Sequence, residues 1–275
     1  LTGLGGFAPH DVVLLTGRQA GEVRAALREV DERIRGRSGS DQAVLLVYYS
    51  GHADAEALHL GDSVLPVLEL ERLVAASQAA LRILILDACR SGALTRVKGF
   101  VAEEPFGQEG KERLPGEGTV FITSSSLDED AQESDQLGAS FFTHHFASGL
   151  LGAADASGDG RVALSEAYRY TYDRTIASTS RTLSGTQHPT YRFDIRGKAD
   201  LVLTEPGSRT NRRARFVLPA AGNYLVMKDS DGGQPVAEVH ADGPRRINLP
   251  PGDYFVRLRG RAHLHEGTVR LDAGR

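Results

Sequence analysis

The chain has 275 residues, with 32 lysines and arginines against 36 aspartates and glutamates, and therefore a formal charge of −4. This near-balance argues against a dedicated nucleic-acid binder, which would carry a basic excess. The single cysteine excludes an internal disulfide framework and a cysteine-rich metal site. The longest apolar runs are far shorter than the ~20 residues that span a bilayer, and no signal peptide is recognised. We expect a cytoplasmic monomer that binds neither nucleic acid nor membrane.

The first two-thirds of the chain alternate strand-like and helix-like segments. Strands are predicted over residues 11–15, 43–49, 81–86 and 119–123, and helices over 19–35, 67–80, 141–149 and 165–175. The run at 43–49 is continuously apolar and aromatic, as expected of a strand that is buried on both faces, and the segment at 81–86 is predicted to be another buried strand. The order of the segments predicts an α/β fold with a mostly parallel sheet flanked by helices.

The composition changes after residue 206, where short alternating segments replace the helical pattern. Strands are predicted over residues 214–218, 224–228, 236–240, 245–249, 254–259 and 267–271. Turn residues such as Asp231-Gly232 separate them. We therefore expect a domain over 1–204, a linker over 205–213 and a small all-β, sandwich-like domain over 214–275. The second domain has no catalytic constellation, so docking or support of the first domain is its expected role.

Reactive side chains follow two of the predicted buried strands. His52 comes after the strand at 43–49, and Cys89 comes after the strand at 81–86. Open α/β sheets build their sites at the carboxyl ends of parallel strands. A histidine facing the thiol would accept its proton and make a thiolate nucleophile. The alternative is a small buried cysteine beside a turn histidine, but the polar neighbours of Cys89 argue against an apolar pocket.

The residues around this pair resemble a known family. The segments YSGH at 49–52 and DACRSG at 87–92 are similar to the His and Cys motifs of caspase-like cysteine peptidases, above all the metacaspases and bacterial caspase domains. The resemblance continues through residues 122–126, 129–133, 141–143, 149–160 and 187–189 and covers roughly residues 1–204. It implies a caspase-like fold and a peptidase activity that needs no cofactor.

The resemblance also implies roles for individual residues. Cys89 would attack the scissile carbonyl, and His52 would act as general base or acid. The backbone N–H groups of Cys89 and Ala53 would form the oxyanion hole. Relatives commonly have Gly where this chain has Ala53; the backbone donor is kept, but the backbone is less free.

The acid two residues before Cys89 sets the expected specificity. Metacaspases have an acid at the position of Asp87, which lines the pocket for P1, the residue before the cut bond. A carboxylate pairs with a guanidinium in a two-pronged way, so we expect cleavage after Arg, then Lys, and not after Asp. Ser50 matches a second pocket position. Asp130 is a third candidate, although an acidic segment such as 128–135 is more often just a solvated loop.

The segment 93–118 breaks the strand–helix pattern and lies where the family carries its processing segment. Its basic residues are candidate self-cleavage sites: Arg96, Lys98, Lys111 and Arg113. The alternative is an ordinary surface loop with scattered charges.

A second motif fits the spacing of a Ca²⁺-binding loop. Its ligand positions are Asp155, Ser157, Asp159, Arg161 (through its carbonyl) and Glu166. The alternative is a turn that caps the following helix. The separate acidic Ca²⁺ site of metacaspases is not expected, because Arg96 lies at the comparable position. The pairs His144-His145 and His263, His265 lack ligand partners at suitable spacing and are expected to be structural or exposed.

Three functions remain open. The first is an endopeptidase with a protein substrate, in a bacterial signalling, stress or defence cascade, activated by proteolysis or by an upstream protein. The second is a binding or regulatory module with little or no activity, and the third is an esterase or transferase that uses the same pair. The presence of His52, Cys89 and Asp87 together favours the first. The family fold opens with a strand, a pocket loop and a helix that would precede residue 1, and we expect the gene to encode them.

Overall fold

The computed structural model describes residues 3–37, 43–89, 111–112, 117–126, 128–196, 200–208 and 213–274. The chain divides into two compact units. The sheet unit contains residues 13–132 and 178–200, and the C-terminal unit contains residues 1–12, 133–177 and 201–275. The domain boundary expected at 205–213 stays a prediction.

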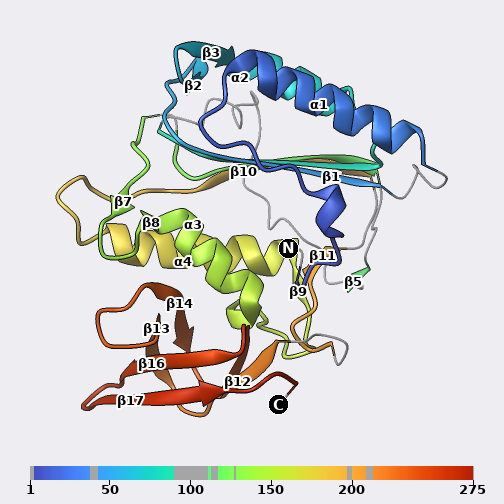
Figure 1. The fold of residues 1–275 in the computed structure, drawn as a ribbon. Helices are drawn as coiled ribbons and strands as arrows, with labels where there is room; N and C mark the ends of the chain where they lie inside the picture. The colour runs from blue at the N-terminus through green and yellow to red at the C-terminus, as the bar shows by residue number, and fades with distance from the viewer. Residues whose placement is uncertain are drawn as a thin grey trace. The chain divides into compact units, whose positions relative to one another are not determined.

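The sheet unit is built on a four-stranded sheet in the order β1-β4-β6-β10 (Figure 1). Its strands are β1 (Val44–Ser50), β4 (Leu81–Asp87), β6 (Glu117–Thr123) and β10 (Thr190–Arg196). The first three strands are parallel, and β10 runs antiparallel to β6. The predicted α/β fold with a mostly parallel sheet is confirmed.

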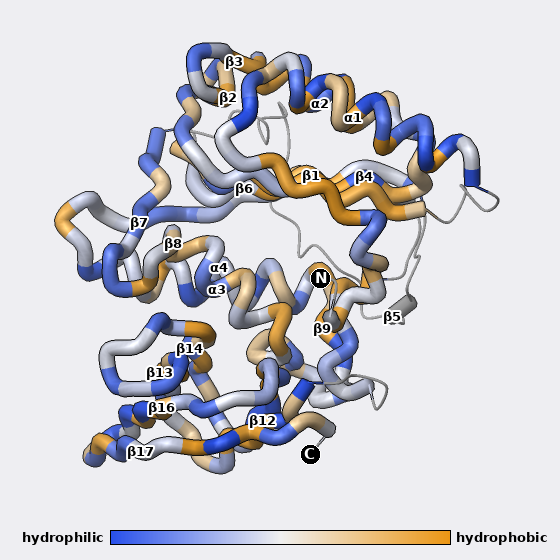
Figure 2. Tube along the Cα trace, viewed as in Figure 1, coloured by the Kyte–Doolittle hydropathy of each residue, from blue (hydrophilic) through white to orange (hydrophobic). Residues whose placement is uncertain are grey.

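Apolar side chains explain why these segments form the centre of the unit. Figure 2 shows β1 and β4 as hydrophobic runs, and Leu84 and Leu86 of β4 are fully buried. Helices α1 (Ala20–Arg35) and α2 (Val67–Ala75) cover one face of the sheet, where Leu70 and Val74 join the same core. Burial of each such side chain contributes about 1.5–3 kcal/mol.

Polar contacts fix the two helices. Helix α1 begins with a capping box in which the backbone N–H of Gln19 donates to Glu22 Oε2 at 3.0 Å. Arg24 of α1 forms a two-pronged pair with Glu69 of α2, with distances of 2.6 Å and 2.8 Å. The predicted helix at 19–35 is therefore confirmed, whereas the helix predicted over 67–80 ends at Ala75.

The strand predicted over residues 11–15 is not formed. Asp11 ends the 3₁₀ turn η1 (Pro9–Asp11), and residues 12–15 have no regular structure. Leu14 is 86% exposed. A strand is stabilised by pairing and by burial of one face, so an apolar run alone is not sufficient. Among the elements that were not predicted are the hairpin of β2 (Ala57–Leu60) and β3 (Ser63–Pro66) and the antiparallel strand β10.

The C-terminal unit combines helices with antiparallel strands. It contains α3 (Phe141–Ser148), the π-turn η4 (Gly149–Ala153) and α4 (Leu164–Thr179), whose last two residues belong to the sheet unit. Two short strands, β7 (Glu133–Ser134) and β8 (Ala139–Ser140), pair before α3. Strand β9 (Val162–Ala163) pairs with β11 (Asp200–Thr204). No helix in the parts of the chain that the structure describes is long and apolar enough to cross a membrane.

The last strands of the unit form two antiparallel sheets that share a core. One sheet pairs β12 (Ala214–Leu218) with β15 (Arg245–Leu249). The other has the order β14-β13-β16-β17, with β13 (Gly222–Lys228), β14 (Pro235–Ala241), β16 (Gly252–Arg259) and β17 (Leu264–Leu271). All six predicted strands are present within three residues of their predicted bounds. Ala153 of η4 and Tyr170 of α4 pack on this core, so the strands and helices stabilise one another.

The edge strand β14 is held by two helical side chains. The Tyr170 hydroxyl donates to the Glu238 carbonyl at 2.7 Å, and the Glu238 N–H donates to Ser148 Oγ at 3.0 Å. Burial raises the pKa of Tyr170 to about 12. Edge strands expose unpaired backbone groups, and these two contacts satisfy both groups of Glu238.

We expect Tyr170→Phe to lower the free energy of unfolding by about 1–3 kcal/mol, because the Glu238 carbonyl loses its donor. Urea unfolding followed by circular dichroism measures the change. Tyr172→Phe is the matched control, since the Tyr172 ring packs on Tyr168 of the same helix. Equal unfolding free energies for Tyr170→Phe and the wild type would show that this contact does not stabilise the strand.

Candidate active site

The ends of β1 and β4 place His52 and Cys89 at one edge of the sheet. The two strands are parallel and in register through the pair Ser50 and Asp87, which are the last residues of their strands. The ladder continues one step further, because the Gly51 N–H donates to the Asp87 carbonyl at 3.2 Å. His52 and Cys89 each follow this pair by two residues. The two predicted catalytic residues therefore follow the paired carboxyl ends of two neighbouring strands.

The backbone of His52 is fixed by two hydrogen bonds. Its carbonyl accepts from the Tyr49 hydroxyl at 2.7 Å and from the His59 N–H at 2.9 Å. Burial raises the pKa of Tyr49. Gly51 has a φ of 159°, which L side chains rarely adopt, and a Cβ atom there would lie 2.8 Å from Tyr49 Oη, so both the backbone and the space favour glycine. The His52 side chain itself is exposed and thus accessible to a substrate.

Ala53 forms an isolated antiparallel bridge with Leu58. The bridge is made by the His59 N–H to the His52 carbonyl and by the Asp54 N–H to the Ala57 carbonyl, at 2.9 Å and 3.0 Å. In this type of pair the N–H of the bridged residue points away from the partner. Neither bond uses the Ala53 N–H, which is the donor that an oxyanion hole requires.

Asp54 holds the turn that follows Ala53. Its carboxylate accepts from His59 Nε2 at 2.7 Å and from the N–H groups of Glu56 and Ala57 at 2.8 Å and 2.9 Å. The His59 ring and these two backbone donors lower the pKa of Asp54 to about 2. The carboxylate is therefore ionised over the whole physiological pH range, and the three hydrogen bonds that it accepts stabilise the turn.

Cys89 is partly exposed and lies against a second loop. Its Sγ atom donates to the Ala131 carbonyl at 3.8 Å. The preceding residue is held by the end of β6, because Ser125 Oγ donates to the Ala88 carbonyl at 3.4 Å. The thiol therefore lies outside the core and can be reached by solvent, as a reactive cysteine must be.

A network that the sequence analysis did not assign fixes the loop next to Cys89. Glu129 accepts from the His188 N–H at 2.7 Å and from His188 Nδ1 at 2.6 Å. The fully buried Gln187 accepts from the Gln132 N–H at 2.9 Å and donates to the Ser124 carbonyl at 2.6 Å. The resemblance includes residues 129–133 and 187–189. Their contacts with one another join residues that are far apart in the sequence, so the sequence pattern alone did not reveal them.

The three predicted pocket residues differ in exposure. Asp87 is 3% exposed, Ser50 is exposed beside it in the paired register, and Asp130 is exposed. Asp130 adjoins Ala131, whose carbonyl contacts Cys89. The backbone therefore brings all three positions to the neighbourhood of the thiol.

The Glu129–His188 pair predicts a pH dependence. Burial raises the pKa of Glu129, but the hydrogen bonds from His188 and Ser126 outweigh it and hold the pKa below its ordinary value. A carboxyl with a lowered pKa in the folded protein stabilises that state above the unfolded pKa, about 4.3. The stabilisation is lost as the pH falls through the folded value. We therefore expect Glu129→Gln to be less stable than the wild type at pH 7 by about 1–3 kcal/mol and nearly equal in stability well below pH 4.

Urea unfolding at both pH values measures this difference. Glu133→Gln, a change of an exposed acid four residues along the chain, is the control and should match the wild type at pH 7. A Glu129→Gln deficit that stays constant down to the lowest pH would contradict the assignment to the ionised carboxylate.

The predicted Ca²⁺ loop uses its carboxylates on its own backbone. Asp155 accepts from the N–H groups of Gly158 and Gly160 at 2.8 Å and 2.9 Å, and Glu166 accepts from the Ala163 N–H at 3.1 Å. Asp159 accepts from the Arg161 N–H at 2.9 Å, and Ser157 Oγ donates to Asp155 Oδ1 at 3.3 Å. These bonds show a turn before α4 that is closed by its own carboxylates, and the binding of Ca²⁺ by this loop stays a prediction. Of the candidate self-cleavage sites, Lys111 lies in β5 (Lys111–Glu112), and Arg96, Lys98 and Arg113 lie outside the described residues.

Comparisons with known proteins show the family of the chain. A family model described as the caspase domain matches residues 2–199. Among solved structures, the crystal structure of caspase-1 from Spodoptera frugiperda is 13% identical with a TM-score of 0.48, over 70% of this chain and 76% of that chain. A structure of pro-Sf-caspase-1 is 12% identical with a TM-score of 0.43, over 70% and 75%. No curated protein matches. The family consists of cysteine peptidases whose chemistry needs no cofactor, and this chain belongs to the caspase domain family.

Proposed function

We propose that the chain is a cysteine endopeptidase that cleaves peptide bonds after Arg and, more slowly, after Lys. The observation that carries the proposal is the parallel register of Ser50 with Asp87, which delivers His52 and Cys89 to the same edge of the sheet. Membership of a peptidase family supports the reaction class.

The chemistry follows from the two side chains. The Cys89 thiolate forms a bond to the scissile carbonyl carbon, and the negative charge develops on the carbonyl oxygen. The N–H groups of Cys89 and Ala53 donate to that oxygen. His52 gives a proton to the leaving amine, and the C–N bond breaks to leave a thioester. Water, deprotonated by His52, then releases the acid product and restores the thiol.

Asp87 supports the basic specificity. A carboxylate that is 3% exposed is stabilised best by a cationic partner. A guanidinium presents two parallel N–H donors to a carboxylate, whereas an ammonium acts as a point charge. The proposal therefore orders the P1 residues as Arg, Lys and last Asp, with Ser50 and Asp130 as further polar contacts of the pocket.

The setting we propose is the bacterial cytoplasm, in a signalling, stress or defence cascade, with the chain as a monomer activated by proteolysis or by an upstream protein. A single free thiol fits a reducing compartment. The sandwich-like strands support the fold, since they share a core with α4 and η4.

Hydrolysis of fluorogenic peptides that differ only in P1 tests the proposal on the full chain. We expect turnover with P1 Arg, less with Lys and none with Asp. Absence of turnover with every amide substrate would favour the binding or regulatory module. Turnover of esters alone would favour the esterase or transferase.

A further inference from the structure

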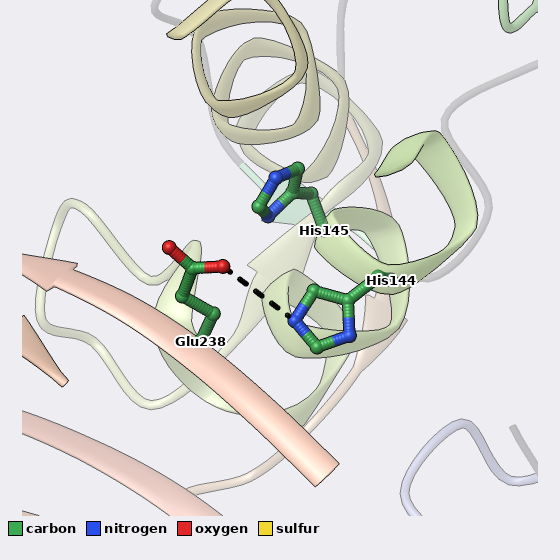
Figure 3. Close-up of side chains that lie close together, drawn as sticks. All are labelled: His144, His145 and Glu238. Carbon is green, nitrogen blue, oxygen red and sulfur yellow. Dashed lines mark ion pairs between the residues drawn. The ribbon is translucent and has the colours of Figure 1, made fainter. Parts of the chain in front are cut away.

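Two histidines and one glutamate of the C-terminal unit lie together, and none of them belongs to the proposed peptidase site. His144 and His145 come from α3, and Glu238 comes from β14 (Figure 3). The nitrogen and oxygen atoms that these side chains offer as ligands all lie within 4.8 Å of one another. Within the described ranges, no other group of three histidine, cysteine or acidic side chains converges so closely.

Both imidazoles are buried. His144 is 6% exposed and His145 is 0% exposed. Imidazole nitrogen, in its neutral form, is a common Zn²⁺ ligand.

The distance between His144 and Glu238 suits a shared ion better than a hydrogen bond. His144 Nε2 lies 3.8 Å from Glu238 Oε2, as the dashed line in Figure 3 marks. Hydrogen bonds of this type measure about 2.7–3.2 Å. Metal bonds of about 2.0–2.2 Å place two tetrahedral ligands about 3.4 Å apart. His144 Nε2 is buried, has no hydrogen-bond partner among the residues that the structure describes, and points at the carboxylate.

The surroundings of Glu238 hold its carboxylate in place. Its backbone is bound by Ser148 and Tyr170, and Arg174 Nη2 lies 3.6 Å from its Oε1 atom. Metal-bound carboxylates are usually supported in this way by a further partner. Because Arg174 already offsets part of the acid's charge, the group suits an ion that prefers nitrogen ligands rather than Ca²⁺ or Mg²⁺.

We propose that His144, His145 and Glu238 bind one divalent transition-metal ion of the Zn²⁺ type, which ties α3 to the edge strand β14. Three protein ligands leave the fourth tetrahedral position for water. All three residues belong to one unit, and none takes part in the proposed peptidase chemistry. The ion thus stabilises the packing of the C-terminal strands on the helices.

The test uses the full chain, stripped with a chelator and titrated with Zn²⁺ in a calorimeter and with Co²⁺ in a spectrophotometer. We expect one ion per chain, the visible bands of four-coordinate Co²⁺, and a rise in melting temperature with Zn²⁺. His144→Gln and Glu238→Gln should each weaken binding by at least about tenfold. Glu238→Gln keeps the side-chain shape, so it remains informative where a histidine variant fails to fold.

The exposed histidines at 263 and 265 supply the matched control. Their rings lie 6.1 Å apart, and as a surface pair they are the rival site for adventitious Zn²⁺. The double variant His263→Ala, His265→Ala should bind like the wild type. Two results would overturn the proposal: no Zn²⁺ or Co²⁺ binding by the wild type, or binding that the His263, His265 variant loses and Glu238→Gln keeps.

Discussion

Cys89→Ala should abolish hydrolysis of a P1-Arg peptide, lowering kcat/KM by at least about 10⁴-fold, because the variant has no nucleophile. Steady-state fluorescence with the full chain measures the loss. The position of Cys89 after β4, partly exposed and against the Ala131 carbonyl, is the structural basis of this expectation. Alanine is smaller than cysteine at a site that is not in the core, so the fold should be retained, which circular dichroism checks.

The chain offers a clean chemical control, since Cys89 is its single cysteine. Iodoacetamide should label the wild type once and inactivate it, and it should leave Cys89→Ala unlabelled. His52→Ala should slow the labelling at pH 7, because the thiolate loses its partner. Retained hydrolysis in Cys89→Ala would place the chemistry on another residue.

Asp87→Asn should lower kcat/KM for the P1-Arg peptide by about 10²–10³-fold. The variant keeps the side-chain shape but removes the charge that we propose pairs with the P1 guanidinium, on a residue that is 3% exposed. Breaking a buried ion pair costs about 3–5 kcal/mol, and every 1.4 kcal/mol corresponds to about tenfold. The same assay with P1 Arg and P1 citrulline, its uncharged analogue, isolates the charge.

The wild type should prefer Arg to citrulline strongly, and Asp87→Asn should show little preference. Asp130→Asn is the comparison variant and should have a small effect, because exposed charge pairs contribute about 0–1 kcal/mol. An Asp87→Asn variant that keeps the full preference for Arg would remove Asp87 from the pocket.

The fold could be predicted where a segment's own pattern decides its structure. Strand β4 is largely apolar and buried because it lies between β1 and β6. Strand β1 also has an apolar run, but it is an edge strand and Tyr48 is 42% exposed, so the expectation that both of its faces are buried is wrong. The six C-terminal strands are separated by turn residues. Residues 12–15 have the composition of a strand, but they are exposed and form no strand in the structure. Composition alone does not reveal whether a segment finds a partner strand. Strand β10 was missed because its sequence, TYRFDIR, mixes charges with apolar residues.

The site could be predicted in part for the same reason. His52 and Cys89 follow strong strands, so their neighbourhood follows from the rule for parallel sheets. Glu129 and His188 are 59 residues apart, and their hydrogen bonds depend on tertiary structure. His144 and His145 were expected to be structural or exposed, since neighbours on a helix face apart; both are buried because β14 packs beside α3.

The most direct test of the central claim is covalent capture with a peptide chloromethyl ketone, followed by mass spectrometry of the intact chain and of its peptides. The probe with P1 Arg should add once, on Cys89, and the matched probe with P1 Asp should react far more slowly. The adduct should disappear in Cys89→Ala and form slowly in His52→Ala and Asp87→Asn. Equal labelling by the two probes, or an Arg adduct on any residue other than Cys89, would contradict a Cys89–His52 peptidase with a basic P1 pocket.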